Sequence, residues 1–286
     1  MELLMDVVLD AAVDTLKLLP FLFLTYLAME ALEHHAGERS EEAVRKAGSL
    51  GPVVGAVLGV VPQCGFSAAA STLFAGRVIT VGTLLAVFLS TSDEMLPILI
   101  AEQAPLSLIG QVLLIKVAVA IVVGFVVDAL VRLAKRDGDG HIHIHELCEQ
   151  EHCDCEDSVL VSAVKHTLQV TLFIFLVALV LGFVIEWVGP EALASFMSQN
   201  PALSVVAASL VGLIPNCAAS VAITELYLEG ALGFGAMMGG LLVSAGVGLL
   251  VLFRTNRPMG LNFAITGVLL AVGVAFGGLL TLVGLG

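Results

Sequence analysis

Two short motifs in this chain combine a helix-breaking proline, an amide side chain and a cysteine. They are Pro62-Gln63-Cys64 and Pro215-Asn216-Cys217, and each interrupts an apolar stretch. At such a break inside a membrane, free backbone carbonyls and N–H groups become available to a ligand. The two thiols suit soft metals or trivalent arsenic, and the amides would orient the ligand. A buried cysteine can also be only a small apolar residue, which is the competing interpretation.

Hydroxyl groups follow both motifs on the helices that begin there. Ser67 is expected to line the first half of a substrate site and Ser220 the second, and each is followed by further polar residues (Ser71 and Thr72; Thr224 and Glu225). Their spacing places them on adjoining parts of one helical face. Hydroxyls in membrane helices also bond back to their own backbone, so a purely structural role is the alternative. Glu225 is a candidate coupling residue.

A second polar motif, Thr91-Ser92-Asp93-Glu94, lies midway along the apolar stretch 78–101. Carboxylates at membrane depth are costly and usually face a cavity or a partner. Lys116 is the obvious candidate partner, and its pair with Asp93 or Glu94 could be a static bridge or a proton-coupling switch. The corresponding stretch of the second half, Ser244-Ala245-Gly246-Val247, has no carboxylate, so the predicted site is asymmetric. Three acids nearer the block ends are expected at the membrane interface: Glu30, Asp128 and Glu186.

The polar centre of the chain carries a cluster of metal ligands. Four histidines and three cysteines fall within residues 141–155: His141, His143, His145, Cys148, His152, Cys153 and Cys155. Such tracts are typical of metal binding, and they favour a Zn²⁺-like ion. No pair of Cys-x-x-Cys knuckles defines a zinc finger. The alternative is a solvated acidic linker.

The elements that position these residues must lie in a membrane. The chain of 286 residues is 58% hydrophobic and 13% charged, whereas a soluble domain carries about 25% charged residues. Eight apolar blocks follow one another, at 16–33, 50–76, 78–101, 106–131, 160–188, 201–228, 231–253 and 260–286. A crossing needs roughly 20 apolar residues, so the composition predicts an all-α polytopic membrane protein and excludes an ordinary soluble enzyme. The net charge of −13 makes nucleic acid an unexpected partner.

The second four blocks repeat the first four. Val61-Pro62-Gln63-Cys64 aligns with Ile214-Pro215-Asn216-Cys217 at an offset of 153, which also carries Gly82 onto Gly235. We therefore predict three parts: a first transmembrane repeat at 1–131, a cytoplasmic His/Cys-rich acidic loop at 132–159 and a second repeat at 160–286.

The basic residues determine the predicted topology, because Lys and Arg stay on the cytoplasmic side of short loops. They follow blocks one, two, four and seven, and only a block that returns to its own side can place all four groups inside. The best candidates are 50–76 and 201–228, which Pro62 and Pro215 divide into short arms. We predict two inverted repeats with six crossings, two re-entrant hairpins and both termini outside. The alternative is that the prolines only kink full crossings.

Three stretches give the chain a family resemblance. Residues 62–71, 88–95 and 214–220 (PQCGFSAAAS, FLSTSDEM and IPNCAAS) resemble the ten-transmembrane heavy-metal exporters, whose members are also described as arsenic efflux proteins or manganese transporters. The resemblance covers nearly the whole chain. It implies export across the inner or plasma membrane and a His-rich loop between the halves. The ten segments match six crossings and four hairpin arms.

The function predicted from these features is export of a heavy-metal cation or an arsenic species, manganese included, by a proton-coupled transporter and not by an enzyme. No Walker motif is present, which excludes an ATP-driven pump within this chain. Expected partners are the lipid bilayer, the transported species and, in a homo-oligomer, other copies of the chain; no permanently bound cofactor is expected. One alternative is a membrane thiol–disulfide oxidoreductase that uses Cys64 and Cys217, and another is a metal sensor without flux.

Overall fold

The computed structural model describes residues 50–62, 64–92, 94–134, 159–188 and 201–285, and short runs between residues 8 and 27. All regular structure in these residues is helical, which confirms the predicted all-α class. Four segments are long and apolar enough to cross a membrane: Val81–Ala101, Leu106–Ala134, Phe234–Thr255 and Met259–Gly284. They coincide with four of the six blocks predicted as crossings.

The described helices fall into two series on either side of the central polar region. The first series is α3 (Gly51–Gly59), α4 (Cys64–Ala75), α5 (Val81–Ser90), α6 (Met95–Ala101) and α7 (Leu106–Ala134). The second is α9 (Val159–Val188), α11 (Pro201–Gly212), α12 (Cys217–Leu228), α13 (Phe234–Val243), α14 (Gly248–Thr255) and α15 (Met259–Leu280), followed by a π-helical turn at Thr281–Leu285.

The sequence offset of 153 residues also relates the helix boundaries. Adding it to the bounds of α4, 64 and 75, gives 217 and 228, the bounds of α12; adding it to 81 and 90 of α5 gives 234 and 243 of α13. The same offset relates the first residues of α6 and α7 to the first residues of α14 and α15. The two halves of the sequence therefore form matching sets of helices.

Helix packing repeats along with the boundaries. At the contact of α5 with α7, a Cβ added to Gly124 would lie 2.8 Å from the Gly82 carbonyl oxygen; at the contact of α13 with α15, a Cβ on Gly277 would lie 2.6 Å from the Gly235 oxygen. Glycine is required at these points because the backbones touch, as in other close contacts of membrane helices. The equivalence of Gly82 and Gly235 thus extends from sequence to packing.

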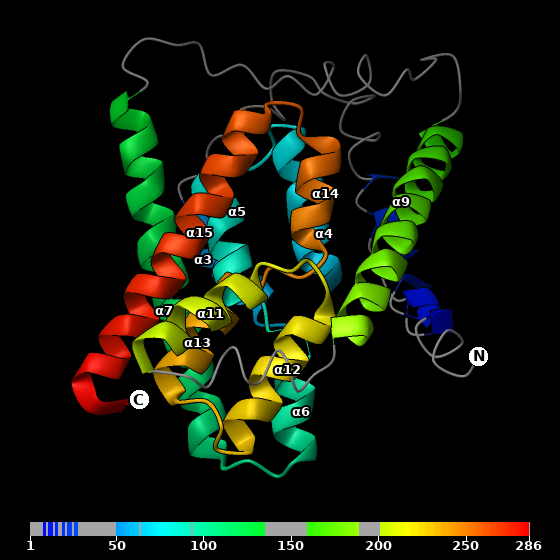
Figure 1. The fold of residues 1–286 in the computed structure, drawn as a ribbon. Coiled ribbons are helices and arrows are strands. Elements are labelled where there is room, and N and C mark those ends of the chain that lie inside the picture. The colour runs from blue at the N-terminus through cyan, green and yellow to red at the C-terminus, as the bar shows by residue number, and fades with distance from the viewer. Residues whose placement is uncertain are drawn as a thin grey trace.

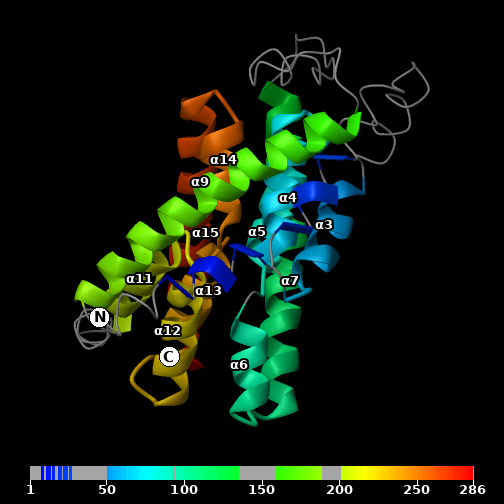
Figure 2. The same cartoon turned by 90° about the vertical axis from the view of Figure 1, so that its right-hand side faces the viewer.

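Equivalent helices run in opposite directions, and the short helices of one repeat lie in the opposite half of the molecule from their counterparts (Figures 1 and 2). In Figure 1, α7 rises toward the end where α9 begins, whereas α15 descends from it; α4 lies in the upper half and α12 in the lower. The repeats exchange partners, because α4 packs against α14 and α12 packs against α6. The connections α4–α5 and α14–α15 share the upper end with the last turn of α7.

The structure adds two features to these expectations. The blocks 78–101 and 231–253, predicted as single crossings, are each divided: α5 ends at Ser90 before α6 starts at Met95, and α13 ends at Val243 before α14 starts at Gly248. Asp128, expected at the interface, is only 6% exposed. Its carboxylate accepts hydrogen bonds from the Gly82 N–H at 2.8 Å and the Thr80 hydroxyl at 2.7 Å, so it satisfies donors at the start of α5.

Candidate functional site

Each Pro-amide-Cys motif lies where one short helix ends and the next begins. In the first, α3 ends at Gly59 and α4 starts at Cys64; in the second, α11 ends at Gly212 and α12 starts at Cys217. Gln63 and the side chain of Cys64 fall outside the described residues. The arms are 9 and 12 residues long in the first pair and 12 and 12 in the second, and at about 1.5 Å per residue neither arm spans the hydrocarbon core.

The second motif shows how its residues are used. Asn216 adopts an extended conformation before α12, and its side-chain oxygen accepts a hydrogen bond from the Ala218 N–H at 3.3 Å. The amide is therefore a helix cap, one of the roles that favour asparagine at this position. Cys217 is the first residue of the helix, 8% exposed and not in a disulfide. The break thus presents a buried thiol at the N-terminus of α12.

The hydroxyls that follow the motifs are buried in both halves. Ser220 donates to the Cys217 carbonyl at 2.8 Å and Thr224 to the Ser220 carbonyl at 2.7 Å, so both bond back to their own helix. Ser71 makes the equivalent bond to Ser67 at 2.9 Å, but it also donates to the Gly248 carbonyl at 2.7 Å, in α14 of the other repeat. Ser67, fully buried, lies against Gly248 as well.

The α5–α6 break contains the predicted acidic motif. Ser90, Thr91 and Ser92 are all at most 4% exposed. Thr91 is the C-cap of α5, and its hydroxyl donates to the Val87 carbonyl at 2.7 Å. Asp93 lies outside the described residues, and Glu94, partly buried, immediately precedes α6 without capping it through its side chain. Hydroxyls and a carboxylate therefore gather where the backbone leaves the helix.

The α13–α14 break lies at the equivalent position of the second repeat. Gly246 has a φ of +53°, a conformation that glycine adopts without strain. Lys116 of α7 is 1% exposed, and its ammonium donates to the Leu241 carbonyl at 2.6 Å. That carbonyl lies in the last turn of α13, where carbonyls lose their helical partners. A buried cation of the first repeat is therefore bonded to the broken helix of the second.

All four breaks lie near the middle height of the molecule, between its upper and lower ends (Figure 1). The contact of α4 with α14 joins the helix of the first motif to the α13–α14 break, and the contact of α12 with α6 joins the second motif to the α5–α6 break. Ser67 and Ser220, Lys116, Glu94 and Cys217 thus belong to elements that meet at this level. Glu225 is exposed, on a different face of α12 from the buried Thr224.

The predicted metal ligands of the central loop are outside the described residues: His141, His143, His145, Cys148, His152, Cys153 and Cys155. Within the described ranges, no three His, Cys, Asp or Glu side chains gather in a group that could hold a metal ion. In the described part of the chain, the four breaks therefore offer hydroxyls, backbone groups and one thiol, and not a preformed cluster of charged ligands.

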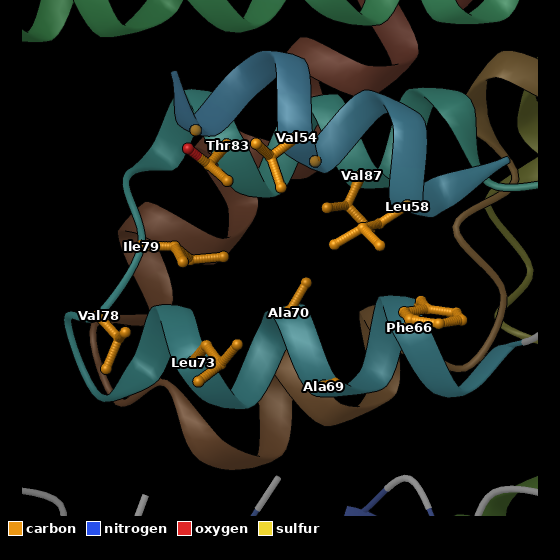
Figure 3. A pocket seen from close by; sticks show the side chains of 12 residues that line it. Val54, Leu58, Phe66, Ala69, Ala70, Leu73, Val78, Ile79, Thr83 and Val87 are labelled. Atoms are coloured by element: carbon orange, nitrogen blue, oxygen red, sulfur yellow. The ribbon is translucent and has the colours of Figure 1, made fainter. Parts of the chain in front are cut away.

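An apolar cavity of about 300 Å³ lies between the arms α3 and α4 (Figure 3). Its wall includes Val54, Leu58, Phe66 and Leu73, and Thr83 contributes the only hydroxyl among the lining residues. An apolar surface of this kind offers nothing to hold an ion or a polar metalloid. The chemistry of the protein is therefore to be sought at the breaks and not in this cavity.

Two parts of this arrangement were not predicted from the sequence. The α13–α14 region was expected only as the carboxylate-free counterpart of Thr91–Glu94, although Ser244 and Gly246 inside an apolar block are a signal of a helix break. The second is the capping role of Asp128, which depends on a contact 46 residues away along the chain.

The fold and these breaks define a polytopic helical membrane protein with a polar centre, the plan of a transporter. A family described as "Putative, 10TM heavy-metal exporter" matches the chain over residues 1–157 and again over 154–284. The chain belongs to this family, so the resemblance noted in the sequence is confirmed. No curated protein and no solved structure matches the chain.

Proposed function

We propose that this protein is a secondary transporter that exports a heavy-metal cation or an arsenic species from the cell. Family membership supports metal transport in general. The observation that carries the proposal is the meeting of four helix breaks from two repeats at one level of the molecule. Broken helices at mid-membrane are where secondary transporters bind their cargo, because the freed backbone groups replace its hydration shell.

The proposed cargo site lies between the two Pro-amide-Cys motifs. Cys64 and Cys217 would supply soft sulfur ligands, and Gln63 and Asn216 would orient the cargo. Cys217 supports this assignment because it is buried at the start of α12, next to the break. Ser67 and Ser220 complete the proposed site one turn further along each helix.

Coupling to protons is assigned to the ionisable residues. Asp93 and Glu94 precede α6, and Lys116 reaches the broken helix α13 of the other repeat. A buried cation that joins the two repeats can stabilise the empty carrier, and a carboxylate can take up a proton or compensate the charge of the cargo. Glu225 is a second candidate proton carrier.

The proposed orientation has the central loop in the cytoplasm and both termini outside. The last turn of α7 and the α4–α5 and α14–α15 connections lie at the same end of the molecule (Figure 1). These segments and the last turn of α14 carry Arg77, Arg132, Arg254 and Arg257. The opposite end holds the α6–α7 and α12–α13 connections, which carry Glu102 and Glu229. This segregation supports the assignment under the positive-inside rule. The His/Cys-rich loop would then capture or sense metal at the cytoplasmic mouth.

The test is uptake by inverted membrane vesicles that contain the protein, with Zn²⁺, Mn²⁺, Cu⁺, Co²⁺ and arsenite offered in turn. We expect gradient-dependent uptake of at least one species and its loss in both Cys64→Ser and Asp93→Asn. Absence of any flux, together with Cys64 and Cys217 cycling between thiol and disulfide, would instead support a membrane oxidoreductase.

A further inference from the structure

Ser244, at the end of α13, is a buried hydroxyl without a hydrogen-bond partner among the described residues. It is 2% exposed, and its oxygen is shielded from solvent. Buried hydroxyls are almost always bonded, so an exception calls for a ligand or water that completes it. The equivalent residue of the first repeat, Thr91, bonds back to Val87. The geometry of a helix break therefore does not by itself leave such a group unsatisfied.

The position of Ser244 connects it with the residues already assigned to the site. It follows Leu241, whose carbonyl accepts from Lys116, by three residues, and residues three apart are neighbours on a helix. It precedes Gly248 by four residues, and Gly248 accepts from Ser71 and lies against Ser67. The α13–α14 break thus joins the buried ammonium to the hydroxyls of α4.

The charge of this break differs from that of its counterpart. The first repeat has Asp93 and Glu94 where the second has Gly246 and Val247, and the Lys116 ammonium is bonded to the helix that ends at the second break. A positive charge repels a bare metal cation at close range. A hydroxyl and an ammonium can both donate hydrogen bonds to an oxygen atom.

We propose that Ser244 binds the cargo directly, by donating a hydrogen bond to an oxygen atom that the cargo carries. The cargo is then a hydroxylated or oxygen-bearing species, held by thiols on one side and by donors of the α13–α14 break on the other. This inference rests on the proposed transport function and narrows its substrate class. It also makes Ser244 a residue that determines specificity.

The experiment compares arsenite, a neutral trihydroxide at neutral pH, with Zn²⁺ in the vesicle uptake assay. Ser244→Ala is expected to raise the KM for arsenite by about 3- to 10-fold, the effect of one lost hydrogen bond, and to leave the KM for Zn²⁺ uptake, where it occurs, unchanged. The thermal midpoint of the variant should be unchanged or higher, because the removed hydroxyl has no protein partner. Ser209→Ala is the matched control: the Ser209 hydroxyl is also fully buried and has no hydrogen-bond partner among the described residues, but it lies in the last turn of α11 and faces Gly239 of α13 and Gly273 of α15.

Four results would overturn the inference. An unchanged KM for arsenite in Ser244→Ala, or an equal change in Ser209→Ala, would show that the hydroxyl does not bind the cargo. Uptake of Zn²⁺ without any uptake of arsenite by the wild type would refute the substrate class and leave the transport function standing. Uptake of no species at all would contradict the transport function itself, and the inference would fall with it.

Discussion

The α5–α6 and α13–α14 breaks lie at equivalent positions of the two repeats, but the charged groups associated with them differ. The α5–α6 break carries three buried hydroxyl residues and the motif with Asp93 and Glu94, whereas the α13–α14 break has Gly246 and Val247 at the acidic positions and receives the ammonium of Lys116. The helix boundaries differ by the same 153 residues on both sides of the break, with 90 and 95 becoming 243 and 248.

This comparison indicates that the two repeats share the glycines that close helix packing requires, whereas their buried polar residues differ. Gly82 and Gly124 have counterparts in Gly235 and Gly277 because the backbones touch in both halves. Lys116 has Leu269 as its counterpart, and both are buried. A pseudo-symmetric set of helices thus carries an asymmetric set of polar residues, and under the proposed function this asymmetry would let the protein bind its cargo in one orientation.

The largest expected effect comes from replacing the buried Lys116 of the first repeat with leucine, the residue found at the equivalent position of the second repeat. Lys116→Leu removes the bond to the Leu241 carbonyl and the positive charge beside the α13–α14 break. Hydrogen bonds to charged groups contribute about 1.5–3 kcal/mol, so gradient-driven uptake should fall by at least about tenfold. Leu269→Met on α15 is the control and should transport normally. Wild-type flux in Lys116→Leu would show that the asymmetry is only structural.

The second prediction tests whether the packing is truly shared. A Cβ at Gly82 would overlap the Gly124 carbonyl, and a Cβ at Gly235 would lie 2.7 Å from the Gly277 carbonyl. Gly82→Ala and Gly235→Ala should therefore each destabilise the protein by about 1–3 kcal/mol, measured as a lowered thermal midpoint in detergent. Gly110→Ala, where no atom lies within 4 Å of the added Cβ, should be neutral or stabilising. If either Gly82→Ala or Gly235→Ala left the thermal midpoint unchanged, the helix packing of the two repeats would not be equivalent at these positions.

The third prediction concerns a difference at the starts of the broken helices. Asp128 accepts two hydrogen bonds at the start of α5, whereas its counterpart Thr281 donates to Gly277 of its own helix at 2.9 Å. Asp128→Asn should lower the free energy of unfolding by about 1 kcal/mol, as the loss of a charged cap does. Thr281→Val should cost less. Chemical unfolding of both variants would reveal the order, and the reverse order would contradict the assignment.

The smallest effect is expected for the hydroxyls on the two motif helices. Ser71→Ala loses a bond to Gly248 that joins the repeats, and its cost should be about 1 kcal/mol. The bond that the structure gives Thr224 stays within α12, so Thr224→Val should have a smaller effect. Equal thermal midpoints for the two variants would mean that the bond between the repeats contributes nothing.

Much of the fold could be predicted because it follows from local signals. Pro62 and Pro215 mark helix breaks, the apolar blocks give the helices, and the offset between the two motifs gives the repeat. All three depend on residue type and spacing within one stretch of chain. The boundaries of α4 and α12 accordingly fall at the cysteines that follow the prolines.

The parts that could not be predicted depend on contacts between distant residues. The bond from Lys116 to Leu241 spans 125 residues and that from Ser71 to Gly248 spans 177. The sequence contained no sign that a freed carbonyl of α13 would accept the Lys116 ammonium. The pairing of Lys116 with Asp93 or Glu94 stays a prediction. The role of Ser244 likewise depends on burial, which one sequence does not show.

The most direct test of the account is transport by the purified protein in proteoliposomes under an imposed pH gradient, with Cys64→Ser and Cys217→Ser beside the wild type. In the proposed mechanism, both cysteines, from opposite repeats, belong to one cargo site. We therefore expect gradient-dependent flux that each single substitution abolishes, with no further loss in the double variant. Flux that survives in either single variant, or no flux from the wild type, would contradict a shared site between the two motifs.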